Sequence, residues 1–228
     1  MVIDTGNYYT NAADYLSSIG ISQIDYLILT NYSTKNICGA EAVLSRFDVN
    51  TVIMPDMDAS QMTAATRKTV NTIKQAQTDF ILVNESEIGR RFEFGEAVFE
   101  LLTPLVIKYE DEYDCYSIAV KLDYKAVSFL FMSDVTPENT QALLDSDTDL
   151  TADVICVSQN GRSAYTSEEL LDRVLPEYAV INIPEPRYEE HLELAERLKI
   201  RGIGIVYTDE ANHQRFVSDG EKVEYIQQ

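Results

Sequence analysis

Short apolar runs bounded by turn residues alternate along the chain with segments whose apolar residues recur at helical spacing. Runs such as Val98-Phe99-Glu100-Leu101 alternate apolar with polar side chains, which predicts strands that have one solvated face or lie near an edge. Interleaved strands and helices are typical of an α/β fold. We predict strands over residues 25–30, 51–54, 79–83, 97–102, 117–123, 128–132, 154–157, 179–183 and 203–208, and a hairpin over 214–225. We predict helices over residues 10–19, 39–47, 59–77, 136–144, 167–175 and 188–199.

Two of these helices carry clear start signals. Thr136 precedes Pro137, which suits a first helical position, and Thr166 or Ser167 precedes the acidic pair Glu168-Glu169. No linker, low-complexity segment or repeat of fixed period divides the sequence. We therefore expect a single domain over residues 1–228, which is long enough to bury a large core.

Several segments resemble the metallo-β-lactamase superfamily in their order and spacing. The opening Val2-Ile3-Asp4-Thr5-Gly6 is followed by a predicted helix and then by a strand that ends at Thr30. Later matching pieces are residues 37–41, 116–120, 129–134, 159–163 and 207–209. The resemblance covers nearly the whole chain. Within the superfamily the sequence is most like the extracytoplasmic domain of ComEC-type DNA-internalisation competence proteins.

This resemblance implies a metallo-β-lactamase-like αββα sandwich. In the resembled branch a hairpin precedes the Ile-Asp-Thr-Gly strand, whereas here Met1 stands directly before the motif. We therefore expect a fragment of a longer protein; the alternative is a first sheet that lacks its first strands and has an exposed edge.

The metal-binding loop of the family is replaced in this sequence. The family follows the second strand with His-x-His-x-Asp-His, which holds one or two zinc ions. The corresponding positions here are Asn31, Ser33, Lys35 and Asn36. Amides and hydroxyls are weak zinc ligands, and an ammonium group repels a dication. Zinc is expected for the family, but we predict no cofactor and no metal ligand for this chain.

The remaining ligand positions are also altered. Asn160 stands where the family has a His before Gly, Ser133 replaces the Gly of the Gly-Asp pair, and Asp134 keeps the bridging carboxylate. The last family His falls on Glu189 or Glu190. We predict a degenerate polar pocket without catalytic residues, formed by Asn31, Ser33, Lys35, Asn36, Ser133, Asp134, Asn160 and Glu190.

One hypothesis concerns the charge inside that pocket. The Lys35 ammonium would partly replace the missing cation and neutralise Asp134. The alternative is that Lys35 points into solvent. The two histidines, His191 and His213, are both interpreted as surface residues, with the alternative that His191 substitutes for a lost ligand.

The net charge of -20 disfavours direct nucleic-acid binding, which depends on clustered Lys and Arg. The three cysteines lack CxxC spacing, so neither a disulfide framework nor a zinc knot is indicated, and they are expected to be buried. No apolar run approaches the length of a membrane span. The resemblance implies an extracytoplasmic location.

Three functions follow as hypotheses. The first is a non-catalytic, metal-free binding or scaffold module that acts on an unknown protein or small-molecule partner. The second is a phosphodiesterase- or nuclease-type hydrolase with atypical ligands, Asp134, Glu190 and His191. The third is a ComEC-like DNA-uptake accessory domain, which would need a local basic patch at Arg90-Arg91 or Arg67-Lys68.

Overall fold

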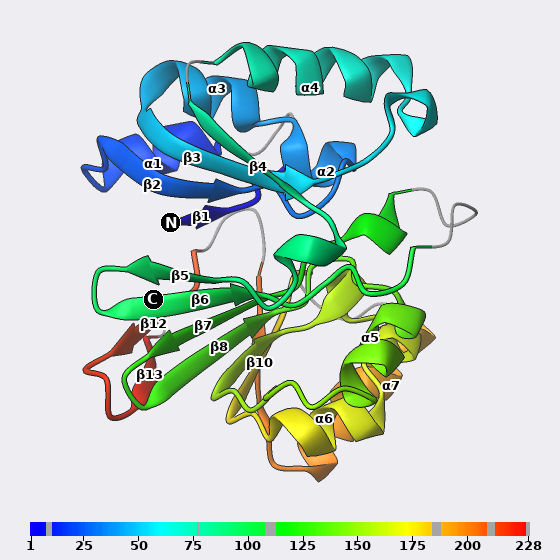
Figure 1. Cartoon of the computed structure of the whole chain (residues 1–228). Coiled ribbons are helices and arrows are strands. Elements are labelled where there is room, and N and C mark those ends of the chain that lie inside the picture. Colours follow the sequence, from blue (N-terminus) through cyan, green and yellow to red (C-terminus); the bar gives the residue numbers. More distant parts are fainter. Residues whose placement is uncertain (8–10, 77, 108–112, 184–187, 209–212, 227–228) are drawn as a thin grey trace. The chain divides into compact units, whose positions relative to one another are not determined.

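The computed structural model describes residues 1–7, 11–76, 78–107, 113–183, 188–208 and 213–226 (Figure 1). The chain divides into two compact units. Unit 1 comprises Met1–Glu87 and Ile107–Ile118, and unit 2 comprises Ile88–Val106 and Ala119–Gln228. Each unit is described by itself, and the expectation of one domain over the whole chain stays a prediction.

Unit 1 is built on a four-stranded parallel sheet of order β1-β2-β3-β4. Its strands are β1 (Val2–Ile3), β2 (Gln23–Ile28), β3 (Asp48–Pro55) and β4 (Asp79–Val83). The connections carry helices α1 (Ala12–Ser18), α2 (Thr34–Ile37), α3 (Ala40–Arg46) and α4 (Ala64–Gln75), of which α3 and α4 lie over one face of the sheet (Figure 1).

The core of unit 1 lies between this sheet and its helices. Leu27 and Val52 of the sheet pack in one cluster with Val43 of α3 and with Val70 and Ile73 of α4. Consecutive residues of β3, from Val52 to Met54, are fully buried. A strand buried on both faces is typical of a parallel sheet and explains why β3 has a continuous apolar run.

Unit 2 contains a seven-stranded mixed sheet of order β11-β10-β9-β8-β7-β6-β5. Neighbouring strands from β5 to β8 pair antiparallel, and those from β8 to β11 pair parallel. The strands are β5 (Arg91–Phe94), β6 (Ala97–Leu101), β7 (Val120–Tyr124), β8 (Val127–Phe131), β9 (Val154–Cys156), β10 (Tyr178–Ile181) and β11 (Gly204–Tyr207). A separate antiparallel hairpin follows, formed by β12 (Arg215–Ser218) and β13 (Val223–Ile226).

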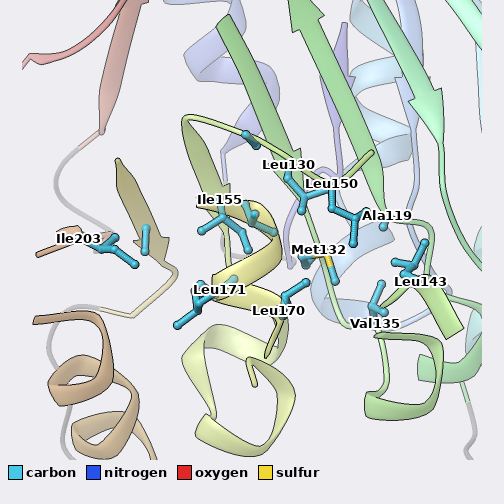
Figure 2. Close-up of a cluster of buried hydrophobic side chains, with 14 of the residues drawn as sticks. Ala119, Leu130, Met132, Val135, Leu143, Leu150, Ile155, Leu170, Leu171 and Ile203 are labelled. Atoms are coloured by element: carbon cyan, nitrogen blue, oxygen red, sulfur yellow. The ribbon is translucent and has the colours of Figure 1, made fainter. Parts of the chain in front are cut away.

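Helices α5 (Pro137–Leu144), α6 (Glu168–Val174) and α7 (Glu189–Ile200) connect the parallel strands of unit 2. Their apolar sides form the main core of the unit with the sheet, as Figure 2 shows for Leu130 and Ile155 of the sheet and for Leu143, Leu170 and Leu171 of the helices. The helices therefore pack against the parallel half of the sheet, and ligand sites in α/β folds usually lie at the carboxyl ends of such strands.

A buried lysine ties β7 to the loop before β9. The Lys121 side chain is only 6% exposed, and its Nζ donates to the Asp149 carboxylate at 2.8 Å and to the Asp149 backbone carbonyl at 3.1 Å. The hydrogen bond from Lys121, followed by the one from Thr151, lowers the pKa of Asp149 to about 2. The Asp123 carboxylate lies 3.8 Å from the same ammonium. The buried cation is thus held mainly by one carboxylate.

The α/β class predicted from the sequence is confirmed. Strand 79–83 has the predicted bounds as β4, and the hairpin at the end of the chain is present. The two predicted helix starts are also correct, because Thr136 accepts from the Asn139 amide and Ser167 accepts from the Leu170 amide. The prediction of a helix at 10–19 is met by α1; residue 10 lies outside the described residues.

Two predictions of secondary structure were inaccurate, and two elements were missed. The predicted helix 59–77 is divided into a 3-10 turn, Ala59–Gln61, and α4, because Thr63 caps α4 by accepting from the Thr66 amide; residue 77 lies outside the described residues. The predicted strand 117–123 begins only at Val120, after a 3-10 turn. Strand β5 and helix α2 were not predicted.

Two further expectations concern cysteines and membranes. The three cysteines are free; the expectation of burial was correct for Cys115, whereas Cys38 and Cys156 are half-buried. Among the described residues, we find no helix whose length and hydropathy would allow it to cross a bilayer.

Candidate functional site

The four predicted pocket residues of unit 1 lie in the segment that follows β2. Asn31 is fully buried; its Oδ1 accepts from the Ser33 amide at 2.8 Å, and its Nδ2 donates to Ser117 Oγ at 3.2 Å. Ser33 then caps α2 by accepting from the Lys35 amide. The segment forms the short helix α2, and the side chains of Asn31 and Ser33 accept hydrogen bonds from its backbone amides.

Asn36 forms the centre of a second hydrogen-bond network. Its Nδ2 donates to the Asp4 carboxylate at 2.9 Å and to Thr30 Oγ1 at 3.2 Å. Asp4 also accepts from the Thr30 amide at 2.8 Å and from Thr30 Oγ1 at 2.7 Å. Thr5 donates through both its amide and its hydroxyl to the Asn36 carbonyl. This ligand position of the family is therefore occupied by an amide that hydrogen-bonds to the residues following β1 and β2.

Lys35 is the exposed member of this group. It lies in unit 1, whereas Asp134 belongs to unit 2. The neutralisation of Asp134 by Lys35 therefore stays a prediction. The same holds for the prediction that the pocket residues of unit 1 and those of unit 2 form one pocket.

In unit 2, Ser133 and Asp134 follow the carboxyl end of β8, and Asn160 lies in the turn that follows β9. The Gln159 amide donates to the Ser133 carbonyl at 3.0 Å, so the two turns are in contact. Ser133, Gln159, Asn160 and Gly161 all have positive φ, between 48° and 85°. Left-handed backbone at residues other than glycine costs about 1 kcal/mol each and concentrates at ligand and active sites. These two turns therefore have a strained backbone.

Gly161 is required by this geometry. A Cβ atom at this position would lie 2.5 Å from Ile181 Cγ2, and φ is +85°. We expect Gly161→Ala to lower the free energy of unfolding by about 3 kcal/mol, measured by urea denaturation, because strain and overpacking add. Gly202→Ala is the matched control, since φ there is +72° but nothing lies within 4 Å. Equal losses for the two variants would contradict the steric part of this explanation.

Glu190, the predicted position of the last ligand, forms an ion pair. Its Oε2 accepts from Arg162 Nε at 3.0 Å. Glu193 on the next turn accepts from Ser163 Oγ at 2.6 Å. Both contacts connect the start of α7 to the segment that follows Asn160, so Glu190 is near this turn but is already paired with a cation.

The expectation of a surface position was wrong for His191 and correct for His213. His191 is only 8% exposed and lies on the core-facing side of α7 with Leu194 and Leu198. Its ring packs edge-on against Tyr188, with 5.7 Å between ring centres, and Nδ1 has no hydrogen-bond partner among the described residues. His191, Leu194 and Leu198 are spaced three and four residues apart, and this helical spacing was the available signal that His191 is buried. The sequence interpretation relied instead on the charged residues next to His191.

The side chains at these positions can be compared with the ligands that the family's zinc requires. Within the described part of the chain, no group of three or more His, Cys, Asp or Glu side chains is placed to hold a metal ion. The loop positions offer amide and hydroxyl groups, and the Asn31 and Asn36 amides already donate to protein oxygens. Zinc sites in proteins use Cys, His and carboxylate ligands. The loop positions of unit 1 therefore offer no side chain of the kinds that zinc prefers.

The sequence is similar to one curated protein. No family model matches the sequence. ComE operon protein 3 of Bacillus subtilis (strain 168) is 23% identical over 198 residues, which cover 86% of this chain. The chain spans about a quarter of the length of that relative, 25%.

Solved structures agree on the fold. Zn²⁺-bound PqqB from Methylobacterium extorquens matches with a TM-score of 0.54 at 10% identity, covering 90% of this chain and 79% of that one. A HARLDQ motif mutant of a Cronobacter sakazakii metallo-β-lactamase matches with a TM-score of 0.51 at 11% identity, covering 87% of this chain and 84% of that one. The E377D mutant of CmlA β-hydroxylase matches with a TM-score of 0.57 at 13% identity, covering 82% of this chain and 44% of that one. The chain therefore has the metallo-β-lactamase fold, and it resembles the ComEC-type proteins represented by ComE operon protein 3.

Proposed function

We propose that this chain is a non-catalytic, metal-free binding or scaffold module with the metallo-β-lactamase fold, belonging to a ComEC-like protein. One observation carries the proposal: the Asn36 amide, at a ligand position of the family, donates to Asp4 and Thr30. A loop ordered by internal hydrogen bonds needs no metal to hold its shape.

The residues of unit 2 support the same proposal. A hydrolase with atypical ligands would use Asp134, Glu190 and His191. Glu190 pairs with Arg162, and an arginine beside a carboxylate competes with a metal ion for it. His191 faces the core of unit 2. The extracytoplasmic location is implied by the resemblance, and the partner of the module is a protein or a small molecule.

Metal analysis together with a hydrolysis assay tests the proposal. The purified chain is dialysed against zinc or manganese and then against buffer, its metal content is measured by elemental analysis, and bis-p-nitrophenyl phosphate hydrolysis is followed in parallel. We expect far less than one metal ion per chain, and the same background hydrolysis for the wild type and Asp134→Ala. Stoichiometric metal together with turnover that Asp134→Ala abolishes would overturn the proposal in favour of the hydrolase.

A further inference from the structure

Helix α4, shown in cyan in Figure 1, has an unusual charge for this chain. Residues 59–78 are the longest stretch of the sequence without Asp or Glu, although the net charge is -20. The same stretch contains Arg67, Lys68 and Lys74. A local positive charge therefore stands within an acidic protein.

All three cations lie on the solvent side of α4. Thr66, Val70 and Ile73 face the core and are buried. The exposed residues follow helical spacing, at Ala64, Arg67, Lys68, Asn71, Lys74 and Gln75. A shallow hollow of about 370 Å³ runs along this side and is lined by Ala64, Arg67, Lys68, Asn71, Thr72 and Gln75. We call these exposed residues, together with Thr72, the α4 surface.

The positive charge of the α4 surface is not neutralised within the described part of the chain. Many other cations form ion pairs, as Arg162 does with Glu190 and Arg201 with Glu168. Neither Arg67, Lys68 nor Lys74 has a carboxylate within ion-pair distance among the described residues. Arg67 instead donates to two neutral acceptors, the carbonyls of Ala59 at 2.8 Å and Met62 at 3.2 Å. These bonds orient the guanidinium, but they do not neutralise its positive charge because neither acceptor is charged.

We propose that the α4 surface binds an acidic segment of a partner protein. Arg67 and Lys74 are two turns apart, about 10 Å, so carboxylates at a similar spacing on one side of a helix or strand could meet both. The Asn71 amide between them can hydrogen-bond to the same segment. This inference rests on the proposed function, since it names the partner of a binding module.

Two other anionic partners fit less well. The α4 surface has no aromatic side chain on which bases could stack, and the net charge of -20 repels a long polyanion such as a nucleic acid. A second copy of this chain would bring another -20 charges to the same contact. A short acidic segment adds few charges and meets the least repulsion.

Fluorescence anisotropy tests the proposal with a labelled peptide of about 15 residues that carries Glu at helical spacing among alanines. The variant Lys68→Glu/Lys74→Glu is compared with Lys199→Glu/Arg215→Glu, which changes the charge equally at cations that have no ion pair among the described residues. We expect the first variant to weaken peptide binding at least tenfold at low salt and the control less than twofold. Binding by the wild type should also weaken as salt rises.

Equal losses of peptide affinity in both variants, or no binding of the peptide by the wild type, would overturn the inference. So would tighter binding of an oligothymidylate of about 20 nucleotides that depends on Lys68 and Lys74, or a dimer in sedimentation that only the α4 variant abolishes. None of these outcomes concerns metal content or hydrolysis, so a failure here is distinguishable from failure of the proposed function.

Discussion

Replacing Asp149 with alanine should lower the free energy of unfolding by about 3 kcal/mol, because it leaves the Lys121 ammonium buried without its main partner. The Lys121 side chain is 6% exposed, whereas that of Asp149 is 68% exposed. The cost of breaking the pair therefore falls on the lysine. Chemical denaturation of the two proteins at neutral pH, with equal slopes, measures this difference.

The reverse substitution is the control. Lys121→Met keeps most of the packing and leaves Asp149 in water, so we expect a loss of about 1 kcal/mol or less. Adding Lys121→Met to Asp149→Ala should recover much of the stability, because no buried charge then remains. If Lys121→Met were as harmful as Asp149→Ala, the desolvated ammonium would not be the cause.

The pH dependence gives an independent check on the same pair. The pKa of Asp149 is lowered from 3.8 to about 2 in the folded chain. A lowered folded-state pKa contributes stability above the unfolded pKa, and this contribution is lost as pH falls from about 4 to about 2. Because the carboxylate is largely exposed, we expect about 1 kcal/mol from it, and Asp149→Ala should lack this part of the acid dependence.

Asp4→Ala should also destabilise the chain by about 3 kcal/mol, because buried donors would lose their acceptor. The carboxylate accepts from the Thr30 amide, from Thr30 Oγ1 and from Asn36 Nδ2, at 2.7 to 2.9 Å. Thr30 is 1% exposed and Asn36 is 9% exposed, so water cannot readily replace the lost acceptor.

Asp25→Ala is the control, because Asp25 is an exposed residue of β2 that accepts a long hydrogen bond of 3.4 Å from Asn50 Nδ2. We expect it to change the stability by about 0.5 kcal/mol or less. The difference between the two variants in free energy of unfolding should be the same with EDTA and with added zinc. A loss for Asp4→Ala that appears only in the presence of zinc would show that metal, and not the hydrogen bonds, orders the loop.

The elements of the fold could be predicted largely from the sequence because their signals are local. The continuous apolar run of β3 and the caps Thr136 and Ser167 are properties of neighbouring residues. Strand β5 also had a signal, since Phe92 and Phe94 alternate with charged residues before Gly95, but the run is only four residues long. A run of that length gives too few repeats to establish a period.

The contacts of the candidate site were less predictable because they join distant parts of the sequence. The resemblance located Asn36 and Glu190, but it gave no indication that Asn36 bonds to Asp4 or that Glu190 pairs with Arg162. His191 was interpreted from its charged neighbours, whereas its burial follows from the orientation of α7 on the sheet. A partner tens of residues away is fixed by tertiary packing, which local patterns do not contain.

The amide of Asn36 also limits how this sequence can change over evolutionary time. Its two N–H groups serve two acceptors, Asp4 and Thr30, at once. A neutral imidazole has one N–H, so a histidine at position 36 could keep only one of these bonds. A single change to the family's residue would therefore lower the free energy of unfolding without completing a set of ligands, since Asn31, Ser33 and Lys35 would still occupy the other loop positions.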